Sequence, residues 1–186
     1  MGEVVRMVLV DLVEEDLMFQ GDNIDKLLEK GGFQTKYVSE IESDPVGVFT
    51  KCHEVLNDIG IDKPTKEDCS ALRYVCECVS RRAGFMVSAG ITALLKKMNY
   101  KDVVVAVDGS VFRFHPHFPN IVKSRIAQLM GTEYQGFSRF TIRQNCNMKL
   151  INSNVKYFQF ELMLSTDGSG RGAALVAAVL EGQCAI

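Results

Sequence analysis

A tight turn between two apolar runs is the first place where this sequence could contact a ligand. The apolar run over residues 105–107 is followed by Asp-Gly-Ser, and apolar residues then resume. Glycine lets the backbone reverse, so the pattern predicts a buried strand, a turn and a return strand over 111–114. Backbone N–H groups at Gly109 and the Ser110 hydroxyl could bind a polar ligand there. The alternative is a plain hairpin turn without a ligand.

Two more hydroxyl side chains, Thr35 and Ser39, lie four residues apart. If this segment is helical, both hydroxyls share one face of the helix and could bind the same polar molecule. The alternative is that Thr35 caps the helix and Ser39 is an ordinary surface serine.

A glycine-rich turn at residues 168–172 precedes a predicted helix from Ala173 to about Leu180. Backbone amides at the start of that helix could meet an anion, but close packing of a strand on a helix accounts for the glycines more simply. His115 and His117 have no acid or cysteine at ligand spacing, so the sequence predicts no metal site.

Composition excludes several functions. The chain has 186 residues with a net charge of −2, so no basic surface for nucleic acid is expected. No apolar window of about 18 residues exists, so we expect no membrane span. The six cysteines include no CxxC pair. They are therefore interpreted as reduced structural residues, which favours the cytoplasm.

Hydrophobic periodicity indicates a helix-rich domain with a few short strands. Thr65 and Asp68 fit the capping box that opens the longest helix, which extends to about Met98. The stretch 131–156 is polar and irregular and is interpreted as an exposed loop. Other helices are expected over 3–19, 23–28, 36–42, 45–59 and 116–129, and strands over 102–107, 111–114 and 157–164.

Five ordered blocks resemble the eukaryotic hexokinase family, a branch of the actin-like ATPase superfamily. They are Gly-Glu-Val-Val-Arg at 2–6, residues 33–44, residues 75–83, residues 107–118 with its Asp-Gly-Ser and His-Pro-His-Phe, and residues 164–174. The resemblance implies an α/β fold, a partial actin-like or ribonuclease H-like lobe. The chain would be the C-terminal part of the large domain over 1–186, with an insertion at about 131–156 and the family pattern lost after about 180.

The resemblance also implies phosphorylation of a hexose at its 6-hydroxyl with ATP, feeding glycolysis. Magnesium would be held mainly by the nucleotide phosphates. The nucleotide-contacting residues would be Thr35, Ser39, Gly109, Ser110, Val111 and Phe114, with Val111 and Phe114 providing apolar contacts.

The family's glycine-rich phosphate loop, catalytic aspartate and sugar ligands have no counterpart in these 186 residues. No catalytic residue is therefore assigned, a hexose would be bound only through other segments, and the chain alone is expected to be inactive. The alternative is a non-catalytic interaction or pseudo-enzyme fragment.

Overall fold

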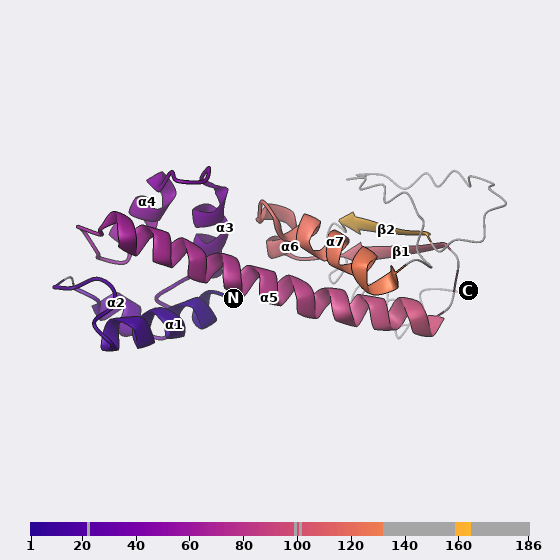
Figure 1. The fold of residues 1–186 in the computed structure, drawn as a ribbon, viewed down its shortest axis with the longest axis horizontal. Helices are drawn as coiled ribbons and strands as arrows, with labels where there is room; N and C mark the ends of the chain where they lie inside the picture. The colour runs from indigo at the N-terminus through magenta and orange to yellow at the C-terminus, as the bar shows by residue number, and fades with distance from the viewer. Residues whose placement is uncertain (22, 99, 101, 132–158, 165–186) are drawn as a thin grey trace, which may run out of the picture.

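A computed structural model describes the chain except for residues 22, 99, 101, 132–158 and 165–186, which are grey in Figure 1. The elements are α1 (Gly2–Glu14), α2 (Asp25–Leu28), α3 (Thr35–Ser43), α4 (Thr50–Asp58), α5 (Lys66–Met98), β1 (Asp102–Val107), α6 (Ser110–Phe114), α7 (Phe118–Met130) and β2 (Gln159–Leu164). The glycine-rich turn at 168–172, the helix expected after it and nearly all of the 131–156 stretch lie outside the described residues.

The 33-residue helix α5 organises the described chain. At 1.5 Å per residue it is about 50 Å long. Helices α1 to α4 surround its first half, whereas α6, α7 and both strands lie along its second half (Figure 1). The two halves of the molecule therefore share one structural axis.

The predicted capping box at the start of α5 is confirmed. The Asp68 backbone N–H donates to Thr65 Oγ1 at 3.1 Å, and Asp68 Oδ2 accepts from the Thr65 N–H at 2.9 Å. Asp68 Oδ1 also accepts from the backbone N–H of Phe19 at 3.1 Å. One buried carboxylate thus both begins the long helix and fixes the segment that follows α1.

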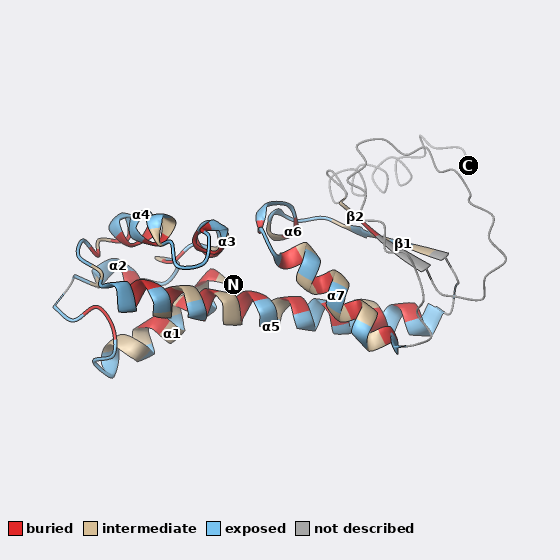
Figure 2. Cartoon of the chain, turned by 45° about the horizontal axis from the view of Figure 1, so that its top comes forward, coloured by how far each residue is buried: buried red, intermediate tan, exposed pale blue. Residues whose placement is uncertain are grey.

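Two hydrophobic cores lie along α5, and Figure 2 shows their buried residues in red. The first contains Leu9, Leu27, Val38, Leu56, Leu72, Val75 and Val79. The second contains Leu95, Phe112, Phe118, Val122, Ile126 and Leu162. Because α5 contributes to both clusters, it fixes the orientation of one relative to the other.

Small residues of α5 allow α7 to pack closely. A Cβ at Gly84 would lie 2.6 Å from Ile121 Cγ2. The buried Ser88 hydroxyl donates to the backbone oxygen of Gly84 at 2.6 Å and lies 3.2 Å from that of Val122. Gly90 has nothing within 4 Å of its Cβ position, so it has no such packing role.

Strand β1 confirms the prediction for 102–107 and pairs in parallel with β2, from Asp102↔Gln159 to Val107↔Leu164. The predicted return strand over 111–114 is wrong, because these residues belong to α6. Gly109 has φ +144°, a conformation that redirects the chain and that side-chain-bearing residues rarely adopt. Five residues are too few for periodicity to separate helix from strand.

The helix predicted from Pro45 is also wrong at its start, since α4 begins at Thr50. Gly47 has φ +83° and interrupts any helix there. The Asp44 carboxylate instead accepts from the Lys51 backbone N–H at 2.7 Å, which satisfies an N–H of the first turn of α4. Similarly, α1 ends at Glu14, short of residue 19.

Candidate functional site

A pocket of about 400 Å³ lies between α3 and α6. Its lining combines hydroxyl groups with two apolar side chains, one cation and one carboxylate, and consists of Thr35, Lys36, Ser39, Glu40, Ser43, Ser110, Val111 and Phe114. The structure therefore brings together five of the six residues singled out in the sequence. Gly109 does not line the pocket, and its contribution is the turn that leads into α6.

One side of the pocket, the α3 wall, is formed by the residues of α3 that line it. The amphipathic pattern of α3 determines which residues these are. Tyr37, Val38 and Ile41 are buried in the first core, so the opposite face presents Thr35 and Ser39 to the pocket, as their four-residue spacing predicted. The interpretation of Thr35 as a helix cap is wrong. Gln34 occupies the cap position, and Thr35 Oγ1 instead accepts from the backbone N–H of Gly2 at 3.1 Å.

The other side of the pocket, the α6 wall, is formed by the residues of α6 that line it. One aromatic side chain of α6 is buried and another is exposed. Phe112 is buried in the second core, which turns Ser110, Val111 and Phe114 toward the pocket. Phe114 is 69% exposed, and the Arg113 guanidinium carbon lies 5.8 Å from its ring centroid. An exposed ring beside hydroxyl groups suits a ligand with one flat apolar part and one polar part.

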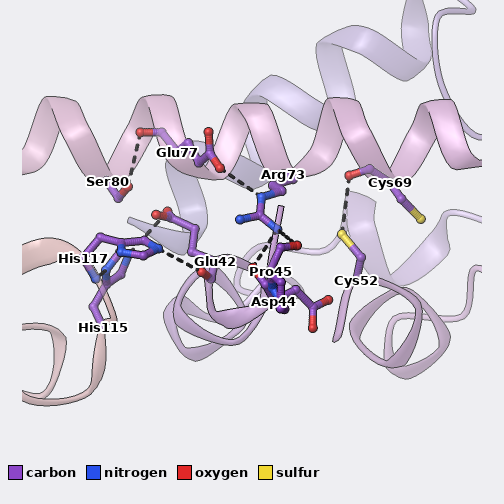
Figure 3. A network of polar contacts seen from close by, with 10 residues as sticks. All are labelled: Glu42, Asp44, Pro45, Cys52, Cys69, Arg73, Glu77, Ser80, His115 and His117. Carbon is purple, nitrogen blue, oxygen red and sulfur yellow. Dashed lines mark hydrogen bonds and ion pairs between the residues drawn. The ribbon is translucent and has the colours of Figure 1, made fainter. Parts of the chain in front are cut away.

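A polar network lies next to the pocket and is shown in Figure 3. His115, directly after α6, and Glu42, on α3, are both buried, with His115 Nε2 3.3 Å from Glu42 Oε1. His115 Nδ1 accepts the backbone N–H groups of His117 and Phe118 at 3.2 and 3.1 Å. The sequence suggested these histidines as part of a family motif and argued against a metal role, but it did not predict this contact.

A second part of the network joins α3 to α5. Arg73 Nη1 donates to the backbone oxygens of Asp44 and Pro45 at 2.9 and 3.0 Å, and Arg73 Nε donates to Glu77 Oε1 at 2.9 Å (Figure 3). The Glu77 carboxylate therefore pairs with the arginine one helical turn toward the N-terminus, and the same arginine contacts the end of α3.

The described cysteines are free thiols, and the surroundings of Cys52, Cys69 and Cys76 shift the pKa values of these three. Cys52 Sγ contacts the backbone oxygen of Cys69 at 3.5 Å. The interaction of the two thiols, followed by burial, raises the pKa of Cys52, while the same interaction lowers the pKa of Cys69. Burial, with the nearby carboxylates of Glu42 and Glu77, raises the pKa of Cys76. Within the described part of the chain, no three His, Cys, Asp or Glu side chains are grouped to hold a metal.

Comparison with known proteins places this geometry in a class. The sequence profile described as "Hexokinase" matches residues 1–179. A solved hexokinase from Schistosoma mansoni, complexed with glucose, superposes with a TM-score of 0.75 at 31% identity, covering 96% of this chain and 35% of that one. The described residues therefore have the helix-rich, actin-like ATPase fold that the resemblance implied.

The chain belongs to the hexokinase family. It is 33% identical to the hexokinase of Brugia malayi over 180 residues, covering 97% of this chain and 27% of that protein. It is 35% identical to Hexokinase-2 of Equus caballus over 185 residues, covering 96% of this chain and 17% of that protein. The chain thus spans about a third or less of these relatives. None of the described helices is long and apolar enough to cross a bilayer.

Proposed function

We propose that this chain forms the nucleotide-binding side of a hexokinase, which transfers the γ-phosphoryl group of Mg-ATP to the 6-hydroxyl of a hexose such as glucose. Family membership supports the reaction class. The observation that carries the assignment of the site is the pocket itself, in which Thr35 and Ser39 of α3 face Ser110 and Phe114 of α6. In the proposed assignment, residues 1–186 are the C-terminal portion of the large domain.

The chemistry of the lining suits adenosine. The pocket volume lies within the range of about 300–1,000 Å³ typical of small-molecule sites. The hydroxyls of Thr35, Ser39 and Ser110 can exchange hydrogen bonds with ribose or phosphate oxygens, while Val111 and Phe114 contact the flat base. A magnesium ion, held mainly by the nucleotide phosphates, would supply charge neutralisation during phosphoryl transfer.

The remaining catalytic parts would come from elsewhere in the hexokinase fold. A carboxylate must take the proton of the attacking hydroxyl, and polar side chains must hold the sugar. We assign neither role to a residue of this chain. We therefore expect that the purified 186-residue polypeptide does not phosphorylate glucose. We also propose that the complete enzyme works in the cytoplasm and supplies glycolysis.

Nucleotide titration of the purified chain tests the site. Wild-type chain should bind Mg-ADP, and Ser110→Asp should weaken that binding about tenfold or more, because it adds a second carboxylate beside that of Glu40 and so increases the repulsion of phosphate. Ser124→Asp introduces the same change at an exposed position of α7 and should bind like wild type. Equal Mg-ADP affinities for all three proteins would show that this pocket is not the nucleotide site. Glucose phosphorylation above a no-enzyme control would refute the expected inactivity.

A second candidate is a non-catalytic role, in which this chain binds polypeptide that supplies the rest of the hexokinase fold. The observation that favours it is the exposure of large apolar side chains along α5, namely Tyr74, Phe85, Met86 and Leu94. Large apolar side chains that are exposed on a helix can mark a binding surface or an aggregation-prone surface. Analytical ultracentrifugation with and without the complementary part of the S. mansoni hexokinase separates the cases. Complex formation without Mg-ADP binding would favour this second role.

A further inference from the structure

Two buried polar side chains, His115 and Glu42, lie against each other beside the pocket. His115 is 3% exposed and Glu42 is 2% exposed. Neither His115 Nε2 nor Glu42 Oε1 makes a hydrogen bond of standard geometry, and the two atoms lie 3.3 Å apart. A buried polar group without a partner is costly, so the two groups stabilise each other as long as they remain adjacent.

The ring of His115 is oriented from its other side. Its Nδ1 accepts two backbone N–H groups at the start of α7. An imidazole nitrogen that accepts carries no hydrogen, so the hydrogen lies on Nε2, which is 3.3 Å from Glu42 Oε1. His117 adds a second link, because its Nε2 lies 3.2 Å from the backbone oxygen of Glu42, which can only accept.

These links join the two walls of the pocket. Glu42 precedes Ser43 on the α3 wall, and His115 follows Phe114 on the α6 wall. Figure 3 shows the His115 and His117 rings reaching from the segment after α6 toward Glu42, while Arg73 holds the end of α3 on α5. The walls pack on different hydrophobic cores, so this contact links an element of the first core to an element of the second.

We propose that Glu42 and His115 are positioning residues, which hold α3 and α6 at the separation that a nucleotide requires. This inference rests on the proposed function for the role of the pocket, but the wall-fixing role itself can be measured without nucleotide. Neither residue lines the pocket, so both act through Ser43 and Phe114 rather than by touching the ligand.

Two substitutions separate the tasks of His115. In His115→Asn the amide oxygen replaces Nδ1 as the acceptor for α7, but the side chain is too short to reach Glu42. In His115→Gln the amide can reach Glu42, but the acceptor for α7 is lost. Glu42→Gln retains a side-chain oxygen at the same distance along the chain, which can lie next to Nε2, and is the conservative variant. His53→Asn, at an exposed position of α4, is the matched control.

Hydrogen–deuterium exchange of the nucleotide-free chain is the first measurement. His115→Asn should speed exchange about tenfold in both 35–43 and 110–117, while 50–58 exchanges as in wild type. His115→Gln should speed exchange only around 117–121. Glu42→Gln and His53→Asn should match wild type. If His115→Asn leaves 35–43 unchanged, or speeds exchange equally in every helix, the positioning role is refuted.

Mg-ADP affinity is the second measurement. His115→Asn should weaken binding about tenfold, because misaligned walls lose preorganisation, whereas Glu42→Gln should stay within about threefold of wild type. If wild-type chain binds no Mg-ADP, the proposed function fails and the exchange data still decide the wall-fixing role. If wild type binds and His115→Asn binds equally well, the positioning role fails and the proposed function stands. If His115→Asn does not fold, Glu42→Met is judged by the same exchange criteria.

Discussion

The backbone N–H of Gly2 donates to Thr35 Oγ1 at 3.1 Å, so the first turn of α1 holds a pocket residue in place. The approach is close, since a Cβ at Gly2 would lie 2.5 Å from the backbone oxygen of Phe33 and 2.6 Å from the backbone nitrogen of Thr35. Backbone atoms cannot move aside as a flexible side chain can. Any larger residue at position 2 must therefore separate α1 from the start of α3.

Gly2→Ala should consequently destabilise the chain by about 1–3 kcal/mol, the usual cost of overpacking. Gly90→Ala is the control, because its Cβ meets nothing within 4 Å and alanine is favoured over glycine inside a helix by about 1 kcal/mol. In urea unfolding, the midpoint urea concentration should be lower than that of wild type for Gly2→Ala and higher for Gly90→Ala. Equal midpoints for wild type and Gly2→Ala would show that α1 does not pack as described.

Phe114→Ala should weaken Mg-ADP binding about fivefold or more, because stacking of a base on an aromatic ring contributes about 1–3 kcal/mol. Tyr74→Ala removes an aromatic ring of similar exposure, 65% against 69%, from α5 instead of the pocket. Isothermal titration of both variants separates ring loss at the pocket from ring loss at the surface. Identical affinities would argue against base stacking on Phe114.

Asp68 should make stability fall in acid. Burial alone would raise its pKa, but hydrogen bonds from the Thr65 side chain and from the Thr65 and Phe19 backbones lower it below the ordinary value. A lowered pKa in the folded state contributes stability above the unfolded-state pKa, and this contribution is lost as pH falls below about 4.

Asp68→Asn should therefore lose about 0.5–2 kcal/mol at neutral pH through its weakened cap, and its stability should depend less on pH in acid. Urea unfolding of wild type and variant between about pH 6 and pH 3 measures both effects. If the free energies of unfolding of wild type and Asp68→Asn change with pH in parallel over that range, Asp68 does not cause the loss of stability in acid.

Cys78 should be alkylated before Cys76, although only two residues separate them on α5. Cys78 is partly exposed, whereas Cys76 is buried and its pKa is raised. Because the thiolate is the reactive form, iodoacetamide should modify Cys78 about tenfold faster or more. Tandem mass spectrometry assigns the modified position, and comparable rates would mean that α5 is turned differently from its described orientation.

Local signals predicted the elements whose determinants lie within a few residues. Thr65 and Asp68 are three apart, and their capping box begins α5 as expected. The apolar run predicted the strand over 102–107. The start of α4 could not be predicted in this way. Asp44 accepts from the backbone N–H of Lys51, seven residues away, and Gly47 between them interrupts the expected helix.

The candidate site was predictable in part for a similar reason. Thr35 and Ser39 share a helix face by spacing alone, so their common direction was foreseeable. Spacing cannot show that α3 and α6 face each other, and only the resemblance to a family brought Ser110 and Phe114 together with them. The Glu42–His115 contact joins distant segments through tertiary packing and left no pattern in the sequence.

The shared helix α5 also constrains which insertions and deletions the chain can accept. One residue added between Val79 and Gly84 would turn everything beyond it by about 100° and move it about 1.5 Å along the axis. The α3 and α6 walls would then point to different sides of the molecule. We therefore expect length changes to be tolerated in the connections around α2 and α4, while the middle of α5 keeps a constant number of residues.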